Sequence, residues 1–320
     1  MKTTIKITTL LLMLSLSVVS CKDDEFEESI FDTNIGYLDP NSYTYEFDKW
    51  LYDNYIVDYN LDFRYRMQDV GSNLDYNLVP VTYEKAQQMA KLVKYLWFDV
   101  YETKVGKQFL RDNGPRIIHL IGSSAYNPDS GTEILGTAEG GLKVTLYRCN
   151  KLNPKSVDDM NEYYFKTMHH EFSHILHQKK SYPTEFNLLS AGKYNPKTWQ
   201  DWSDDEANSL GFVTNYAGSE AREDFVEVIA NRLVLSDDQW NAILTRAENT
   251  PNEEGIKGKE LILQKYEIAK KWLAESWNID IEAMRAEILE RQNNVIIHAD
   301  NLDDLFQDQA ADNNNDNQDK

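Results

Sequence analysis

Hydrophobic positions recur at helical spacing in the part of the chain that follows residue 37. A single apolar stripe runs through residues 83–109, which are therefore predicted to form one long amphipathic helix. The stripe consists of Ala86, Met89, Ala90, Val93, Leu96 and Trp97. Gly114-Pro115 interrupts the pattern, because neither residue favours the continuation of a helix. We therefore expect residues 37–114 to form an N-terminal helical region that packs on the rest of the protein.

Two short apolar runs and then longer helical patterns follow this break. Residues 116–121 and 141–149 are typical of strands, since glycine and proline lie around both. Ser156 with Asp159 fits the N-terminal cap of a helix that runs to about His177. Further helices are predicted just after Ser203, over residues 220–235 and over residues 261–289. This order of helices, strands and helices predicts an α+β fold that is mostly helical with a small sheet.

The N-terminus has the features of an export signal. A basic start precedes the apolar run Ile7–Val19, which is too short to span a bilayer. Leu16 to Cys21 resembles a bacterial lipobox, in which the chain is cleaved before the cysteine and the thiol is lipidated. The alternative is an ordinary secretory signal with a chance cysteine, but Cys21 is one of only two cysteines. Lipidation of Cys21 would leave Cys149 without a partner for an intrachain disulfide.

Charge narrows the range of partners. The formal net charge is −20, which argues against nucleic acid and against adhesion to anionic headgroups. Residues 22–28 carry acids in dense succession, so residues 21–36 are predicted to be a solvated tether. The C-terminal residues 301–320 are predicted to be a disordered acidic tail.

The pentapeptide His170-Glu171-Phe172-Ser173-His174 carries the clearest chemistry. On a helix, the two histidines lie one turn apart on the same face, so both imidazoles can bind one ion. Zinc suits such ligands, and Glu171 is placed to take a proton from a water held by that ion. The alternative is a pair of surface histidines that happen to lie near acids. We favour the Zn²⁺ site of a hydrolase with Glu171 as its general base.

Two histidines fill only half of a tetrahedral site, so a third ligand must come from elsewhere. The pattern HExxHxxGxxH is excluded, because His177 and Lys180 stand where its glycine and third histidine would be. His177 is interpreted as a residue that packs beside the ligands or hydrogen-bonds one of them. Glutamates of the later helix remain as candidates. They are Glu220, Glu223 and Glu227.

Spacing alone favours two of these glutamates. Glu223 and Glu227 are four residues apart and can face the metal helix together, one as ligand and one as hydrogen-bond partner of a ligating histidine. A solvated acidic face would account for Glu220 and Asp224.

The stretch Tyr216–Glu227 resembles the third-ligand helix of the glutamate-zincins (gluzincins) related to anthrax lethal factor. In that family the first glutamate of a Glu-aromatic-aromatic-Ala-Glu run is the ligand, and a tyrosine seven residues earlier faces the substrate oxyanion. The resemblance implies that Glu223 binds the metal, Glu227 supports a histidine ligand and Tyr216 is catalytic. Asp224 departs from the family pattern, which often has an aromatic residue there.

The lipobox, the acidic stretch and this metal site together resemble the substrate import-associated zinc metallohydrolase lipoproteins of Bacteroidetes. The acidic stretch is similar to their signal for export to the cell surface. The resemblance implies a hydrolytic role and names no substrate. We expect a zinc metallopeptidase that acts on peptide or protein. The resemblance also implies an outer-membrane lipoprotein, exposed at the cell surface beside a TonB-dependent transporter and its lid lipoprotein.

These features divide the chain into a lipoprotein signal peptide (1–20), the tether (21–36), the helical region (37–114), a catalytic domain (115–300) and the tail (301–320). The resemblance implies that the catalytic domain is zincin-like. An alternative function is a non-catalytic lipoprotein that binds glycan or peptide around a structural zinc, although such a site has no need of Glu171. Hydrolysis of a non-peptide amide or a glycoconjugate is a third possibility.

Two features have open interpretations. The strand predicted at 141–149 could be an edge strand that pairs with an extended peptide, or an ordinary core strand. Trp199 and Trp202 could form a wall of a substrate cleft or anchor the core, and core anchoring is the preferred interpretation.

Overall fold

The computed structural model of the protein describes residues 38–67, 76–127, 131, 133–139, 142–248 and 255–307. The chain divides into two units, Met1–Lys49 and Trp50–Lys320. In the first unit, the described residues form turns and the start of helix α2 (Tyr45–Leu51). The predicted signal peptide, Cys21 and the acidic tether lie outside the described residues.

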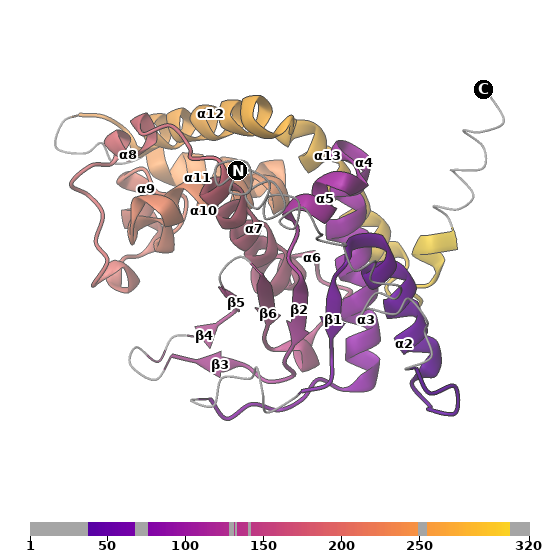
Figure 1. The fold of residues 1–320 in the computed structure, drawn as a ribbon. Helices are drawn as coiled ribbons and strands as arrows, with labels where there is room; N and C mark the ends of the chain where they lie inside the picture. The colour runs from indigo at the N-terminus through magenta and orange to yellow at the C-terminus, as the bar shows by residue number, and fades with distance from the viewer. Residues whose placement is uncertain are drawn as a thin grey trace, which may run out of the picture. The chain divides into compact units, whose positions relative to one another are not determined.

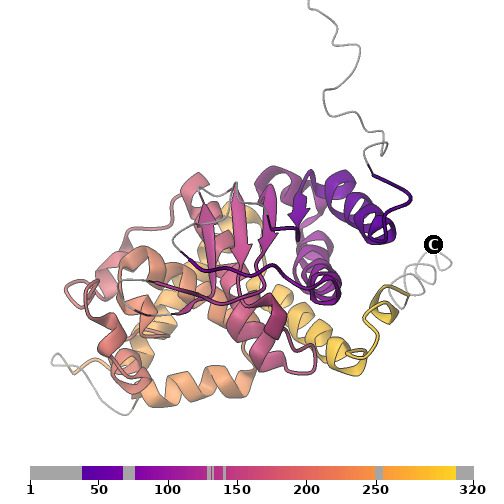
Figure 2. The ribbon, with the colours of Figure 1, turned by 90° about the horizontal axis from the view of Figure 1, so that it is seen from below.

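A four-stranded sheet forms one part of the second unit, with the strand order β1-β2-β6-β5 (Figure 1). The first three strands are parallel, and β5 is antiparallel to β6. Figure 2 shows these strands from below. Their bounds are Asp62–Arg64 (β1), Ile117–Leu120 (β2), Gly136–Glu139 (β5) and Lys143–Leu146 (β6). A second sheet pairs β3 (Ala125–Tyr126) with β4 (Glu133–Ile134).

The sheet confirms both predicted strands, decides one open alternative and corrects one expectation. The strand within residues 141–149 is the central strand β6, since β2 and β5 pair with it on opposite sides. The edge strand on this side is therefore β5, which was not predicted. The region 37–114, predicted to be helical, also contributes β1 to the same sheet.

The long helix predicted over residues 83–109 is divided. Thr82 caps α3 by accepting a hydrogen bond from the Lys85 amide, and the helical path then continues through a π-helical segment into α4. Gly106 ends it, because its φ of 106° lies in the region that favours glycine. The bounds are Tyr83–Val93 (α3), Lys94–Phe98 (π-helical), Asp99–Val105 (α4) and Lys107–Asn113 (α5). A further π-helical segment, Tyr52–Val57, follows α2.

The later helices follow the predicted order, but the helical stretch predicted over residues 261–289 forms two helices. Ser156 caps α6 by accepting a hydrogen bond from the Asp159 amide, and a π-helical segment leads from α6 into the helix that carries the histidines, α7. The bounds of this run are Val157–Met160 (α6), Asn161–Phe165 (π-helical) and Lys166–Lys179 (α7). Ser203 forms a complete capping box with Glu206 at the start of α9, which is the short helix expected there.

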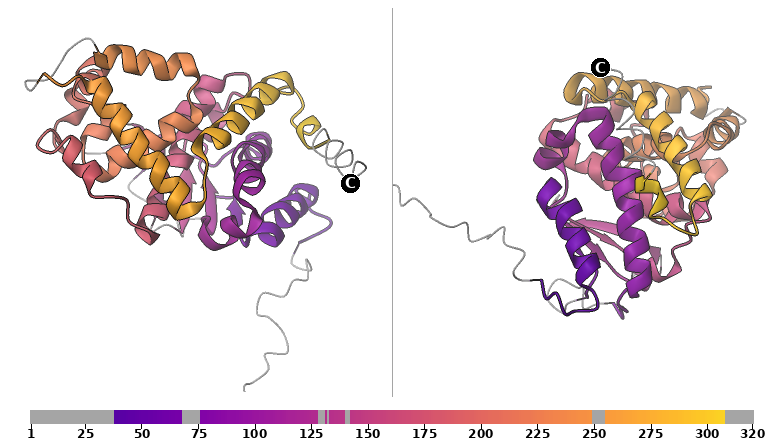
Figure 3. Two further views of the ribbon diagram at one scale, coloured as in Figure 1. Left: turned by 90° about the horizontal axis from the view of Figure 1, so that it is seen from above. Right: turned by 90° about the vertical axis from the view of Figure 1, so that its right-hand side faces the viewer.

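Of the remaining helices, α10 packs directly against α7. Their bounds are Glu185–Leu189 (α8), Asp204–Ser209 (α9), Ala221–Val234 (α10), Asp237–Glu248 (α11), Gly258–Trp277 (α12) and Ile281–Ile297 (α13). Helix α10 packs against α7, α12 and α13, and Figure 3 shows α12 and α13 from above in orange and yellow. The predicted α+β fold, mostly helical with a small sheet, is confirmed.

Aromatic side chains pack on the buried face of α7. Phe172 is buried, and its ring centroid lies 5.0 Å from those of both Trp97 and Tyr101. This cluster fixes the helix that carries the predicted metal ligands against the region before residue 114.

Cys149 is also buried, and burial raises the pKa of its thiol to about 12.

The segment after α13 corrects the predicted tail. Leu302 and Leu305 are buried, and the Phe306 ring lies 6.0 Å from that of Trp50. Residues 301–307 therefore pack on the protein, whereas the rest of the predicted tail lies outside the described residues. Across the part of the chain that the structure describes, no helix has the length and apolar character needed to cross a bilayer.

Candidate metal centre

Helix α7 places His170 and His174 side by side. Their Nε2 atoms are 3.2 Å apart and their ring centroids 4.8 Å apart. The four-residue spacing gives this geometry because residues i and i+4 share one face of a helix. The two imidazoles therefore point at the same place, as the sequence predicts.

Helix α10 brings a carboxylate to that place. Glu223 Oε2 lies 3.0 Å from His170 Nε2 and 3.2 Å from His174 Nε2. Ligand atoms of these three residues all lie within 4.8 Å of one another. Glu220 does not join them, because its carboxylate pairs instead with Arg222 at 2.9 Å on the surface. Of the candidate glutamates, the structure thus places Glu223 where a third ligand is needed.

Glu227 lies behind His170. Its Oε1 is 2.8 Å from His170 Nδ1, and its Oε2 accepts hydrogen bonds from Thr214 and Asn231. A carboxylate in this position holds the proton of His170 on Nδ1 and leaves the lone pair of Nε2 for an ion. The carboxylate is buried, and its other contacts hold it in place, so the ring orientation of His170 is set by α10.

His177 lies behind His174 in the same way. His177 Nε2 is 2.9 Å from His174 Nδ1. His177, predicted to pack beside the ligands or to hydrogen-bond one of them, therefore contacts a predicted ligand directly. Its ring also lies 5.5 Å from that of Tyr182.

The electrostatics of the site favour a cation. Burial lowers the pKa of His170, but hydrogen bonds with Glu223 and Glu227 outweigh burial and raise the pKa to about 10. Burial raises the pKa of Glu227, yet the charge of Lys166 and the contact with His170 bring it down to about 2. The two carboxylates, Glu223 and Glu227, thus stabilise a positive charge on the His170 imidazole between them. Two imidazole nitrogens and one carboxylate oxygen are also the donor set of a catalytic zinc site, so these residues fit the ion.

A cavity of about 420 Å³ opens beside the three predicted ligands. Glu171 lines it one residue from His170, and burial raises the pKa of this carboxyl group. Gly136 and Thr137 of the edge strand β5 also line it. β5 carries no strand signal in its sequence, because this short run contains glycine and has no apolar alternation.

Tyr216 also lines the cavity. It belongs to a single helical turn, Tyr216–Gly218, just before α10. Its ring centroid lies 5.8 Å from that of His170. Burial, together with the charge of Glu223, raises the pKa of its hydroxyl group. The hydroxyl therefore stays protonated and is a hydrogen-bond donor beside Glu223, at the cavity wall.

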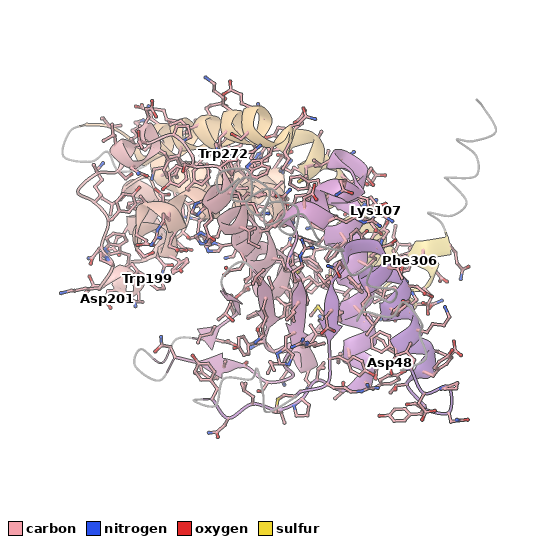
Figure 4. The ribbon with its side chains drawn as sticks, viewed as in Figure 1. Asp48, Lys107, Trp199, Asp201, Trp272 and Phe306 are labelled. Carbon is pink, nitrogen blue, oxygen red and sulfur yellow. The ribbon has the colours of Figure 1, made fainter. Side chains whose placement is uncertain are left out.

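The two tryptophans of the long connection differ. Trp202 stacks on Phe212 at 5.9 Å and lies against Gly218, where an added Cβ would come within 2.1 Å of the indole. Trp202 therefore anchors the turn that carries Tyr216. Trp199 packs edge-on against the Tyr216 ring at 5.0 Å, and Figure 4 shows it on the connection that leads to α9, well apart from Trp272 on α12.

Asp224 corrects the expectation of a solvated acid. Its side chain is fully buried and lies 2.6 Å from the equally buried Lys265 Nζ of α12. Tyr194 also donates a hydrogen bond to Asp224 at 2.9 Å, and Lys265 donates one to the Gly211 carbonyl at 2.6 Å. This ion pair joins α10, beside Glu223, to α12 and to the long connection.

The chain is similar to known proteins in sequence and in fold. Residues 40–282 match a protein family described as "Putative zinc-binding metallo-peptidase". The fold is similar to the crystal structure of a putative zinc-binding metallo-peptidase from Bacteroides caccae. The two chains are 46% identical with a TM-score of 0.68, and the match covers 78% of this chain and 92% of the other. No curated protein matches the chain.

Proposed function

Because the chain belongs to the family described as "Putative zinc-binding metallo-peptidase", we propose that it is a zinc-dependent metallopeptidase. His170, His174 and Glu223 would hold the ion. The observation that carries the proposal is the convergence of three ligand atoms within 4.8 Å at the wall of a cavity that Glu171 also lines.

When bound, zinc would polarise the scissile carbonyl and lower the pKa of a water molecule to about 7. Glu171 would accept the proton that the attacking water loses and return it to the nitrogen of the cleaved bond. The raised pKa of Glu171 suits both transfers, because a carboxyl group that ionises closer to neutral pH can take and release a proton.

Tyr216 would stabilise negative charge as it develops on the carbonyl oxygen. Its hydroxyl stays protonated, and the ring is held between His170 and Trp199. A fixed donor that faces the reacting oxygen needs little reorganisation during the reaction. This supports the role that the resemblance to the gluzincins implies for Tyr216.

The edge strand supports a peptide as substrate. β5 pairs with β6 on one side and ends the described sheet on the other, and two of its residues line the cavity. An extended peptide can add to such an edge through main-chain hydrogen bonds. A glycan has no comparable row of amide groups.

The direct test is to measure zinc in the purified protein and its cleavage of a mixed peptide library. Zinc near one equivalent with cleavage that a chelator abolishes is the expected result. Full zinc occupancy with no peptide cleaved would contradict the proposal, and would favour the binding lipoprotein or the hydrolysis of another amide.

We further propose that the protein is an outer-membrane lipoprotein exposed at the cell surface, lipidated at Cys21, beside a TonB-dependent transporter and its lid lipoprotein. The support is the sequence of residues 1–28, with its apolar run, lipobox-like segment and acidic stretch. The similarity to a protein of Bacteroides caccae agrees with this setting.

A further inference from the structure

We propose that Arg222 selects substrates that carry a carboxylate near the scissile bond. The inference rests on the proposed peptidase function and adds a substrate class to it. Arg222 lies in the first turn of α10, next to Glu223, and lines the same cavity as the predicted ligands.

The cavity extends along α7, and Arg222 lies toward one end of it. Gly136 of β5 lies beside Thr167 near the start of α7, where an added Cβ would come within 2.6 Å of Thr167 Cγ2. His177 and Gln178 line the cavity near the other end of the helix.

Arg222 belongs to the His177 end. Toward its N-terminus, α10 approaches this end of α7, because Glu227 contacts His170 whereas Glu223 also contacts His174. The Phe225 ring of α10 also stacks on that of Tyr182 at 4.0 Å. The Tyr182 ring lies 5.5 Å from that of His177. A peptide that starts beside β5 and passes the predicted ligands would therefore continue toward Arg222.

The charge of Arg222 is unusual in its surroundings. Among the described residues that line the cavity, it is the one lysine or arginine, and two carboxylates, Glu171 and Glu223, line the same space. The whole chain carries a net charge of −20. A cation in this position attracts the negatively charged groups that the rest of the surface repels.

Arg222 contributes little to the stability of the fold. Its side chain is 65% exposed, and it pairs with Glu220, which is 46% exposed. Ion pairs of this kind contribute little to folding because water and salt screen them. The pair does show that the guanidinium can hold a carboxylate: Nη2 donates to Glu220 Oε1 at 2.9 Å.

The chemistry of the guanidinium fits a second carboxylate. Its five donors form a planar fork that matches the two oxygens of a carboxylate. One described bond goes to Glu220, so other donors can bond a carboxylate that enters from the cavity. That carboxylate can belong to an Asp or Glu side chain or to the C-terminus of the substrate.

The test uses one cleavable peptide in four forms, with Glu or Gln beside the scissile bond and with a free or an amidated C-terminus. The full-length protein, purified in detergent, should cleave at least one carboxylate form with a kcat/KM about ten-fold above that of its neutral counterpart. The form that gains identifies the source of the carboxylate. The advantage should shrink as ionic strength rises, because the partner is exposed.

Arg222→Gln should abolish this preference, and Arg222→Glu should reverse it in favour of a peptide with Lys at the same position. Both variants should keep their zinc content and melting temperature. The matched control is Arg64→Gln, which removes an exposed arginine that pairs with Asp62, two residues away, as Arg222 does with Glu220. The control should keep the preference.

Binding separates this inference from the function on which it rests. The same four peptides are titrated into the zinc-loaded Glu171→Gln protein, with and without Arg222→Gln, so that the preference is measured even if no bond is cleaved. Equal binding or cleavage of carboxylate and neutral peptides by the protein with Arg222 would overturn the inference. A preference that survives Arg222→Gln would overturn it as well.

Discussion

The Nε2 atom of His177 lies 2.9 Å from the Nδ1 atom of His174. If His174 binds zinc through Nε2, its proton must be on Nδ1, so His177 Nε2 must accept that hydrogen bond with its lone pair. The two predicted histidine ligands are therefore held by different groups: His170 by the carboxylate of Glu227 and His174 by a neutral imidazole.

His177→Phe should weaken zinc binding by about ten-fold or more, the usual effect of removing the hydrogen-bond partner of a ligand. His177→Gln should recover part of the affinity, because its amide oxygen can accept the same hydrogen bond. Competition with a chromogenic chelator measures both values, and His298→Phe is the control. If the Phe variant binds zinc as tightly as the wild type, His177 only packs against the site.

The ligand set makes a second prediction. Single alanine changes at His170, His174 and Glu223 should each lower bound zinc at least ten-fold, because each removes one of few ligands. Glu220→Ala is the matched control, since this glutamate is the N-cap residue of α10, three residues before Glu223, and pairs with Arg222. Metal analysis after dialysis gives the answer. Loss of zinc in Glu220→Ala, with zinc retained in Glu223→Ala, would refute the assignment.

Glu171→Gln separates catalysis from metal binding. Glutamine has nearly the same size and favours helices, so the protein should stay folded and keep its zinc. Peptide cleavage should fall by about 10²–10⁴-fold, the contribution of a placed acid–base group. Tyr216→Phe should act on the same step through the loss of one hydrogen bond, worth about 3 kcal/mol in comparable sites. Cleavage by Glu171→Gln at the wild-type rate would show that Glu171 is not the base.

The buried pair of Asp224 and Lys265 gives a prediction on stability. Lys265→Met should lower the free energy of unfolding by about 3–5 kcal/mol, because it leaves a buried carboxylate without its partner. The double variant Asp224→Leu with Lys265→Met should recover much of that loss, since neither charge is then buried alone. Urea unfolding of the single and double variants measures both. Equal stability of Lys265→Met and wild type would mean that the pair is not formed in solution.

Anchoring can be tested without reference to activity. Growth with a labelled fatty acid should mark the wild-type protein, and Cys21→Ala should abolish the mark because the thiol is the attachment point. Protease added to intact cells then tests exposure at the surface. A Cys21→Ala protein that keeps the label would end the lipoprotein proposal.

The parts of the site that were predictable from sequence are those that depend on local spacing. His170, Glu171 and His174 lie within one and a half helical turns, so periodicity alone places them together. Glu223 is 49 residues from His174, and spacing could narrow the third ligand only to a helix. The packing of α10 on α7 brings Glu223, rather than Glu220, to the histidines.

The features that were not predicted from the sequence depend on contacts between residues that are far apart along the chain. The edge strand β5 contains Gly136 and little apolar character, and it is a strand because β6 supplies its hydrogen bonds. Asp224 resembles a solvated acid in sequence, and its partner Lys265 comes from another helix. The division of the long helix at Gly106 was readable in principle, because a glycine inside a helical pattern is a known point of interruption.

The distance along the chain between His174 and Glu223 has a mechanical consequence. An ion bound by both residues would cross-link the chain and close a loop of 49 residues. Much of this loop is the connection that carries Trp199 and Tyr216. A cross-link of this kind restricts the unfolded chain and binds the folded one, so stability becomes a function of free zinc concentration. The same ion that would serve the reaction would thus also hold one wall of the cavity in place.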